Sequence, residues 1–277
     1  MDTPLVTVVI PVYNMEDFLP ETLRSVLSSD YPQLEIIVVD DGSRDGSLDV
    51  ALEFAHQDNR ITVISQPNAG VAAARNRAIS VCHGELIFPV DADNTIEPSL
   101  ISQAVSAILA DPEVKVVAPQ ADFFGTRQGL WKLPPFSLHL LAHKNIMDTC
   151  ALYYRKDWEK AGGYCEYIVA REDWEFWISV LKDGGKVVRL KDVGLHYRVR
   201  EQSKRVSDRQ LKRHVIDTLN YLHPEFFKRE LGGPLRYHRS WSVAINKLLG
   251  WQHHSCEDSS LNLREKKQKL KQLKRDS

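Results

Sequence analysis

The sequence lacks the features of a membrane-spanning, disulfide-bonded or nucleic-acid-binding protein. No apolar run approaches the roughly 18 residues that span a bilayer, and the start, Met1-Asp2-Thr3-Pro4, has no signal-peptide pattern. The formal net charge is −1, so we expect no overall attraction to nucleic acid. The four cysteines lie far apart without the spacing of a zinc site, which favours reduced thiols. We therefore expect a cytoplasmic protein.

The two common glycine-rich phosphate-binding patterns are also missing. There is no G-x-G-x-x-G after the first expected strand and no G-x-x-x-x-G-K-[ST] anywhere. Any phosphate must therefore be held in another way.

With 277 residues and 43% hydrophobic content, the chain can bury a large core. We expect an α/β domain over residues 1–205 and a helical extension with a basic tail over 206–277.

Apolar, β-branched runs alternate with helical patterns through the first third of the chain. Strands are expected at residues 5–10, ended by Pro11, and at 34–39, 61–64 and 85–90. A helix follows each of the first three, and Ser47 is the expected cap of the second helix. This alternation predicts a mostly parallel sheet flanked by helices, with a ligand crevice at the carboxyl ends of the strands.

Two of these strands end in pairs of carboxylates. Asp40 and Asp41 follow the second strand, and Asp91 and Asp93 follow the fourth. Tyr13, after the first strand, is expected on the same rim. Paired carboxylates can hold Mg²⁺ or Mn²⁺, which keep open positions for substrate phosphates. The alternative is a turn in which Asp side chains bond their own backbone.

The middle of the chain is less regular. A helix is expected over residues 98–110 and strands over 114–118, 149–154 and 186–190. Residues 122–147 read as a long loop, either lining a substrate site or running over the surface. Residues 193–203 read as a strand or loop, in which Arg198 and Arg200 can neutralise a diphosphate.

A helix over residues 171–181 carries three carboxylates in its first turn. These can simply complement the helix dipole. Alternatively, a carboxylate beside the apolar side chains of Trp174 and Trp177 would have a raised pKa and act as a general base.

Helical patterns dominate from Ser207 onward, with one apolar stripe around Leu219 and another that includes Trp241 and Leu248. Such stripes serve a core or a homodimer. Residues 264–277 carry seven Lys or Arg against two acids. This tail is expected either as a solvated, frayed helix or as an attachment to anionic lipid on the inner face of the membrane.

Several motifs in order resemble one family, the inverting family 2 glycosyltransferases with a GT-A (Rossmann-like) fold, of the bacterial cell-surface polysaccharide type. The resemblance runs from about Leu5 to Ser203. It rests on Val8-Val9-Ile10-Pro11-Val12-Tyr13-Asn14, Ile36-Ile37-Val38-Val39-Asp40-Asp41-Gly42-Ser43, Asn68-Ala69-Gly70-Val71-Ala72-Ala73-Ala74-Arg75-Asn76, Asp91-Ala92-Asp93, Gly162-Gly163-Tyr164 and Glu172-Asp173-Trp174.

The resemblance implies a role for each matching residue. The donor nucleotide and sugar would be bound by Pro11, Tyr13, Asn14, Asp40, Asp41, Arg75 and Asp91, with Arg198 and Arg200 nearby. Asp93 would bind Mn²⁺ or Mg²⁺. His196 would be a further metal ligand, but many relatives carry a histidine a few residues later, where this chain has Arg200. Asp173 would be the catalytic base, oriented by Glu172.

The resemblance therefore implies metal-dependent transfer of a sugar, with inversion, from a nucleotide-diphosphate donor such as a UDP-sugar. The acceptor would be a hydroxyl of a glycan or a lipid-linked molecule. Two alternatives stay open: a non-catalytic nucleotide- or glycan-binding module of the same fold, and a sugar nucleotidyltransferase. The latter typically carries a glycine-rich, basic loop after the first strand, which Pro11-Val12-Tyr13-Asn14 does not provide.

Overall fold

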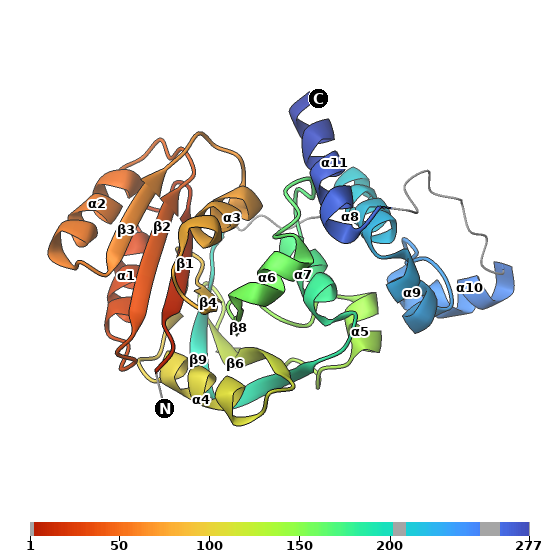
Figure 1. Cartoon of the computed structure of the whole chain (residues 1–277), viewed down its shortest axis with the longest axis horizontal. Helices are drawn as coiled ribbons and strands as arrows, with labels where there is room; N and C mark the ends of the chain where they lie inside the picture. Colours follow the sequence, from red (N-terminus) through yellow and green to blue (C-terminus); the bar gives the residue numbers. More distant parts are fainter. Residues whose placement is uncertain (1–2, 202–208, 250–260, 277) are drawn as a thin grey trace. The chain divides into compact units, whose positions relative to one another are not determined.

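The computed structural model describes residues 3–201, 209–249 and 261–276 (Figure 1). The chain divides into two compact units, and each is described by itself. The first unit contains residues up to 132, 148–157 and the described residues from 185 to 201. The second contains residues 133–147, 158–184 and the described residues from 209 onward. The expected domain boundary at 205/206 lies outside the described residues and stays a prediction.

The first unit is built on a nine-stranded sheet. Its described strands are β1 (Val6–Val12), β2 (Leu34–Asp40), β3 (Ile61–Ser65), β4 (Leu86–Pro89), β5 (Thr95–Ile96), β6 (Val114–Gly125), β7 (Gly129–Leu130), β8 (Leu152–Tyr154) and β9 (Lys186–Val199). The order is β3-β2-β1-β4-β8-β6-β9-β5, and β7 pairs with β6. Strands β1 to β4 pair in parallel, whereas β8 is antiparallel to both neighbours. The expected α/β class is confirmed.

Helices cover both faces of the parallel strands. They are α1 (Leu19–Leu27), α2 (Ser47–Gln57), α3 (Val71–Val81) and α4 (Leu100–Ala110). Val6, Val8 and Ile10 share one buried cluster with side chains of α1, α2 and α4. Helix α3 packs on β1 and β2, and its four buried alanines allow a close approach. Strands buried on both faces explain the nearly continuous apolar runs of the sequence.

The first strand continues through Pro11, where the sequence predicted its end. Proline has no backbone N–H to donate. Because the pairing of β1 with β4 stops at Val9, no residue of β4 needs a hydrogen bond from position 11. Helix α2 begins at Ser47 after Gly46, and Ser47 is not its cap. Instead, the carboxylate of Asp45 accepts hydrogen bonds from the backbone N–H and the hydroxyl of Ser47.

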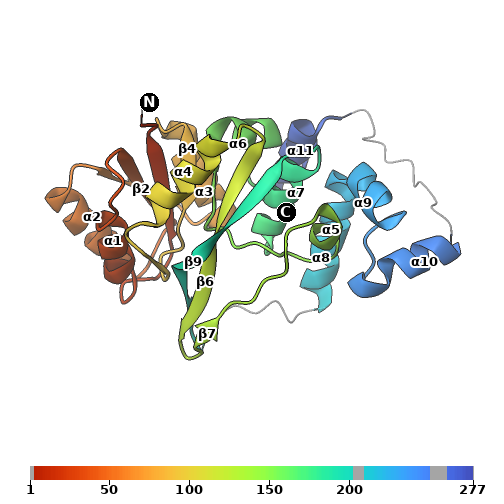
Figure 2. The same cartoon turned by 90° about the horizontal axis from the view of Figure 1, so that it is seen from below.

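The expected loop after residue 122 is wrong for its first part. Strand β6 continues to Gly125 and pairs in parallel with β9, which is one long strand where the sequence suggested two segments (Figure 2). The register between them shifts around Gln120, so a bulge absorbs the polar interruption in β9. Phe123 stacks on Trp131, with ring centroids 5.1 Å apart, which gives this end of the sheet an aromatic cluster.

The second unit is helical. It contains α5 (Leu138–His143), α7 (Glu172–Leu181), α8 (Arg209–Leu222), α9 (Pro224–Leu231), the short η1 (Arg239–Trp241), α10 (Ser242–Leu249) and α11 (Leu263–Asp276). Helix α6 (Arg155–Ala161) runs from the first unit into the second. The large side chains of Trp174, Phe176, Trp177 and Phe227 are fully buried in this unit. The expected helical extension is confirmed as a set of C-terminal helices.

One expectation for the C-terminal helices differs from the structure. The basic tail is not a frayed helix over its described residues, because α11 is formed and Lys266 and Lys267 are buried. The second apolar stripe, expected to serve a core or a homodimer, is exposed at two of its positions: Trp241 is 66% and Leu248 83% exposed. No helix in the described parts of the chain has the length and apolar character needed to cross a bilayer.

Candidate functional site

The carboxyl ends of β1, β2 and β4 bring three predicted segments to one edge of the sheet. In the parallel register Val12 pairs with Asp40, and Val9 pairs with Pro89. Tyr13 and Asp41 directly follow β1 and β2, and Asp91 lies two residues after the end of β4. This edge, with the side chains that surround it, is the rim that the alternating pattern predicted for a ligand.

Each carboxylate of the Asp-x-Asp triplet is paired with an arginine. The Arg75 Nη2 atom lies 2.7 Å from Asp91 Oδ1, and Arg200 Nε lies 2.9 Å from Asp93 Oδ2. Burial and the neighbouring charge of Asp91 raise the pKa of Asp93 to about 6, although Arg200 acts in the opposite direction. The cost of burying this carboxylate next to Asp91 therefore outweighs the effect of Arg200 on its pKa.

Arg198 holds the loop that carries the triplet. Its Nε donates to the backbone carbonyl of Asp93 at 2.8 Å, and its backbone N–H donates to Asn94 Oδ1 at 3.0 Å. Its guanidinium pairs with Glu21 and lies over the ring of Phe124, 4.2 Å from the centroid. Arg198 is thus anchored on three sides, and Asp93 sits in a preformed loop.

The carboxylates after β2 hold neighbouring loops. Asp41 is buried and accepts hydrogen bonds from Gln66 Nε2 at 2.7 Å and from the backbone N–H groups of Ala69 and Gly70 at 2.9 and 2.8 Å. Asp40 accepts from the Ser43 backbone at 3.2 Å. These contacts define the entry to α3, and the predicted contacts with a nucleobase or ribose stay predictions.

The loop after β1 offers an exposed ring. Tyr13 is 38% exposed, whereas Pro11 is buried within the strand. Asn14 has a positive φ of 54°, and its Oδ1 accepts a hydrogen bond from the Arg44 backbone at 2.8 Å. The loop is therefore fixed to the segment after β2, and the Tyr13 ring is presented at the rim.

His196 is placed between two carboxylates. Its Nδ1 lies 2.7 Å from Asp122 Oδ1, and its Nε2 lies 2.9 Å from Glu97 Oε1. Burial by itself would lower the pKa of His196, but the two carboxylates raise it. Both ring nitrogens are engaged in this arrangement, and the expected role of His196 as a metal ligand stays a prediction.

The residues around Asp93 fit a divalent cation that takes further ligands from a bound donor. Among the residues that the structure describes, no three His, Cys, Asp or Glu side chains gather into a complete metal-binding group. Asp91 and Asp93 nevertheless supply hard oxygen atoms next to each other, and burial, together with the charge of Asp91, raises the pKa of Asp93. Mg²⁺ and Mn²⁺ suit such a site, since these ions are often held by one or two carboxylates and substrate phosphates.

In the second unit, the first turn of α7 positions Asp173. The helix begins after Arg171, which has a positive φ of 65°. Asp173 Oδ2 accepts a hydrogen bond from Asn145 Nδ2 at 2.5 Å, and Oδ1 accepts from the Trp174 backbone at 2.8 Å. The buried Trp174 donates its indole N–H to the Leu141 carbonyl at 2.6 Å. Packing and two hydrogen bonds thus hold one carboxylate in one orientation.

Sequence reasoning missed several of these partners. Asn145 lies in the predicted loop over 122–147 and carries no motif of its own. Glu21, which pairs with Arg198, lies in a helix where it reads as an ordinary surface residue. Phe124, whose ring lies under the Arg198 guanidinium, belongs to the predicted loop over 122–147. Their roles depend on contacts between residues far apart in the chain, and a single sequence does not mark such contacts.

The acidic turn of α7 also includes a buried ion pair. Glu175 is fully buried, and its two oxygens lie 2.8 Å from His223 Nε2 and 2.9 Å from Lys267 Nζ. Burial alone would raise the pKa of Glu175, but Lys267 and the hydrogen bonds lower it to about 2. This carboxylate is therefore ionised, and it joins α7 to Lys267 of α11 and to His223, which lies between α8 and α9.

Comparison with known proteins identifies the family. The model of the family described as "Glycosyl transferase family 2" matches residues 7–171, which is more than half of the chain. The chain belongs to this family, and the resemblance inferred from its motifs is confirmed.

Individual relatives match over part of their length. The chain is 37% identical over 126 residues to the "Putative glycosyltransferase EpsH" of Bacillus subtilis (strain 168), covering 46% of this chain and 37% of that protein. It is 26% identical over 197 residues to the "Hyaluronan synthase" of Pasteurella multocida, covering 69% of this chain and 20% of that protein. The chain therefore spans well under half the length of these curated relatives.

Solved structures support the fold. S. aureus TarS 1–349 in complex with UDP-GlcNAc matches with a TM-score of 0.68 at 20% identity, over 90% of this chain and 76% of that one. The mannosyltransferase PcManGT from Pyrobaculum calidifontis, in complex with GDP-Man and Mn²⁺, matches with a TM-score of 0.62 at 20% identity, over 91% and 77%. At this identity the likeness establishes the GT-A-like fold alone.

Proposed function

We propose that this chain transfers a sugar, with inversion at the anomeric carbon, from a UDP-sugar to a hydroxyl of a growing polysaccharide or its lipid-linked precursor. The observation that carries the proposal is the cluster of Asp91, Asp93 and their arginines at the carboxyl edge of the sheet, in a member of glycosyl transferase family 2. The complex of TarS with UDP-GlcNAc and the similarity to a hyaluronan synthase support the choice of donor and product class.

The first task of the site is to hold a departing diphosphate. When the anomeric C–O bond breaks, its electron pair goes to the diphosphate, and the negative charge there increases. Arg200, Arg198 and Arg75 provide guanidinium groups at the strand ends, where they can pair with phosphate oxygens. Such fixed charges lower the barrier because they are in place before the bond breaks.

Asp93, with Asp91 beside it, would hold Mn²⁺ or Mg²⁺. A bound cation would supply Lewis-acid stabilisation of the leaving diphosphate. The complex of the PcManGT relative with GDP-Man and Mn²⁺ supports this cofactor class. Whether His196 joins Asp93 is a separate prediction, since that side chain is bonded to Glu97 and Asp122.

The second task is to activate the acceptor. Asp173 would take the proton of the acceptor hydroxyl as that oxygen forms its bond to the anomeric carbon on the face opposite the leaving group. The hydrogen bond from Asn145 orients the carboxylate, and Glu172 would help to orient it. A single displacement of this kind inverts the anomeric configuration.

A thermal-shift screen tests the proposed donor class. Nucleotide sugars with different bases are added with Mn²⁺, and a ligand that binds only the folded state raises the melting temperature. We expect UDP-sugars and UDP to raise it by more than GDP-, CDP- or ADP-sugars, and chelation of the metal to remove most of the effect. No shift with any nucleotide sugar would contradict the proposal.

The remaining partners are part of the same proposal. The acceptor would be a glycan or lipid-linked glycan, with the protein in the cytoplasm. In the described part of α11, Lys267 and Lys271 are paired with Glu175 and Glu166. These two lysines have protein partners, so a contact with anionic membrane would depend on the other basic residues of the tail. A homodimer would involve the exposed apolar side chains of α10.

A further inference from the structure

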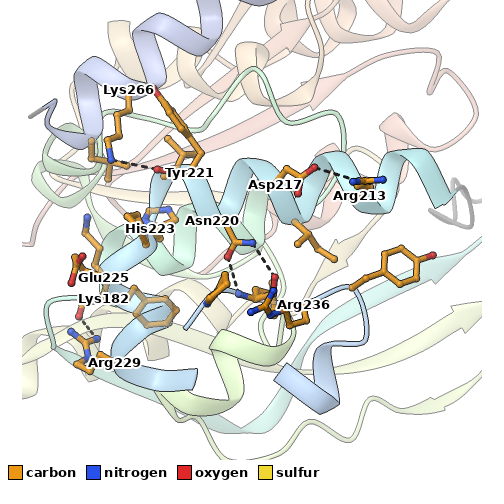
Figure 3. Close-up of a pocket in the computed structure, with 18 of the residues that line it drawn as sticks. Lys182, Arg213, Asp217, Asn220, Tyr221, His223, Glu225, Arg229, Arg236 and Lys266 are labelled. Atoms are coloured by element: carbon orange, nitrogen blue, oxygen red, sulfur yellow. Dashed lines mark hydrogen bonds and ion pairs between the residues drawn. The ribbon is translucent and has the colours of Figure 1, made fainter. Parts of the chain in front are cut away.

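A large pocket lies within the helical unit. It has a volume of about 1290 Å³ and is lined by α8, α9, residues 234–238, the residues just after α7 and the start of α11 (Figure 3). Pockets for small ligands commonly measure roughly 300–1,000 Å³, so this one can hold several sugar rings. All of its lining residues belong to the second unit, and none is among the residues proposed to bind the donor, the metal or the acceptor.

The lining is more basic than the chain as a whole. Five Lys and Arg side chains line the pocket against three Asp and Glu, whereas the whole chain has a formal net charge of −1. Arg213 pairs with Asp217 at 3.8 Å, and Lys266 Nζ donates to the Tyr221 carbonyl at 3.4 Å (Figure 3). These basic groups already have a partner.

Lys182 differs from the other basic residues of the lining. Its side chain is half-buried, and its ammonium forms no ion pair or hydrogen bond with any residue that the structure describes. Burial lowers the pKa of Lys182, although the charges of Asp183 and Glu175 act in the opposite direction. A half-buried cation without a close counter-charge gains most from an anion that enters the pocket.

The wall around residues 234–238 is preformed. Asn220 makes two hydrogen bonds with the backbone of Leu235, at 2.8 and 2.9 Å. Arg236 donates from Nε to Asn246 Oδ1 at 2.8 Å and from its backbone to Ser242 Oγ at 3.0 Å (Figure 3 labels Asn220 and Arg236). A wall that is ordered before the ligand arrives lowers the entropy cost of binding.

Aromatic rings complete the lining. Tyr237 is 38% exposed, and the ammonium of Lys212 lies 4.0 Å from its ring centroid. Tyr221 and Phe226 also line the pocket. A tyrosine offers an apolar face for the C–H surface of a sugar ring and a hydroxyl for its polar edge. The pocket thus combines aromatic rings with a cation that lacks a close partner.

We propose that this pocket holds an acidic glycan, a saccharide chain that carries carboxylate or phosphate groups, with Lys182 binding an anionic group and Tyr237 packing on a sugar ring. The inference rests on the proposed function, since such a site would retain the acceptor chain between transfers. It extends that function by assigning the acceptor an acidic character and a binding site outside the catalytic residues.

Calorimetry on the full chain tests the pocket. The probes are a hexamer of galacturonic acid and a phosphorylated pentamannose, with maltohexaose as the neutral control. We expect at least one acidic probe to bind at least about tenfold more tightly than maltohexaose, with binding weakened by added salt. Lys182→Met should weaken that binding about tenfold, whereas Lys247→Met, an exposed lysine of α10 outside the pocket, should not change it.

Tyr237→Ala provides a second variant and should weaken binding about threefold or more. If circular dichroism shows that Lys182→Met does not fold, binding by Tyr237→Ala alone tests the inference. Equal binding of acidic and neutral probes, or unchanged binding in the folded variants, would overturn the inference. UDP binding with Mn²⁺, measured on the same wild-type preparation, reports on the proposed function separately. If the wild type does not bind UDP, the proposed function is contradicted, whatever the result for the pocket.

Discussion

At the scale of single residues, the distinctive feature of the site is a carboxylate that is disfavoured in its charged form. Asp93 is largely buried beside Asp91, and Arg200 offsets only part of this cost. Functional sites often keep such unfavourable charges because a ligand is meant to relieve them. In this account the relief comes from the cation and the donor, so the free protein carries the cost.

Asp93→Asn should therefore stabilise the free protein while weakening the binding of donor and metal. The pKa of Asp93 is about 6 in the folded state against 3.8 for the free side chain. The contribution of protonated Asp93 to the stability of the fold is therefore fully present below pH 3.8 and is lost as the pH rises through 6. At pH 7.5, with a chelator, we expect a gain on the order of 1 kcal/mol.

Thermal melting of Asp93→Asn at pH 7.5 and pH 4 checks this sign, since the gain should disappear at the lower pH. Asp192→Asn, an exposed position in β9, is the matched control and should leave the melting temperature unchanged. A lower melting temperature for Asp93→Asn at pH 7.5 would show that the pair with Arg200 outweighs burial.

Asp173→Asn tests the assignment of the catalytic base. The amide keeps the shape of the side chain but cannot take a proton from the acceptor. We expect UDP to bind nearly as in the wild type and turnover to fall by a factor of roughly 10² to 10⁴. Single-turnover kinetics and calorimetry separate the two effects. Glu159→Gln, an exposed position in α6, should keep full turnover. Near-normal turnover of Asp173→Asn would reject this base.

At the scale of elements, α11 is an integral part of the second unit. Lys267 is buried, pairs with Glu175 and also donates to the Gly163 carbonyl at 2.7 Å. Lys271 pairs with Glu166 at 2.8 Å. The helix thus connects the chain end to the segment before α7 and to α7 itself, the helix that carries Asp173.

Lys267→Met should destabilise this unit by about 3 kcal/mol, because it leaves Glu175 buried without its cation. Urea unfolding followed by tryptophan fluorescence measures the loss, since Trp174 and Trp177 lie in α7. Adding Glu175→Gln to the variant should recover part of it. Arg275→Gln, an exposed position in the same helix, should change little. Equal stability of Lys267→Met and wild type would show that the pair contributes nothing.

The lowered pKa of His223 predicts how the stability of the same unit changes at acidic pH. Burial lowers the pKa of His223 to about 4, against 6.5 for the free side chain, so the folded state prefers the neutral ring. Stability should fall as the pH drops from 6.5 to 4. The low pKa of Glu175, about 2 against 4.5, then adds a second loss between pH 4.5 and 2.

His223→Gln removes the titrating ring. Its unfolding free energy should therefore change less than that of the wild type between pH 6.5 and 4, whereas the loss below pH 4.5 should remain. Denaturant titrations at several pH values give both slopes. An identical fall in the two proteins would show that another group is responsible.

Most elements of the first unit were predictable, because period and composition decide them. Runs such as 34–39 are long and β-branched, and their burial on both faces follows from the helices between them. The extension of β6 to Gly125 was not predictable, because it depends on β9 from far along the chain and on a bulge that restores the register. The exposure of Trp241 likewise depends on tertiary context.

The candidate site was likewise predictable only in part. Asp41, Asp91 and Tyr13 follow strand ends, so topology alone predicted their shared edge. The pairing of Arg75 with Asp91, of Arg200 with Asp93 and of Asn145 with Asp173 depends on three-dimensional contacts. Family motifs named several of these residues, but they did not give their partners.

At the scale of the whole molecule, the proposed chemistry is divided between two units. The sheet edge of the first unit would hold the donor, and α7 of the second would carry the base. The basic pocket in the second unit would retain an acidic acceptor chain. The family assignment covers residues 7–171 and therefore includes parts of both units.

The most direct test of the account is the release of UDP from a panel of UDP-sugars incubated with Mn²⁺, followed by proton NMR. We predict that at least one donor is cleaved, with the freed sugar first appearing in the opposite anomeric configuration, and that Asp93→Ala reduces the rate to background. A folded protein that neither binds nor cleaves any UDP-sugar, or a fully active Asp93→Ala variant, would contradict it.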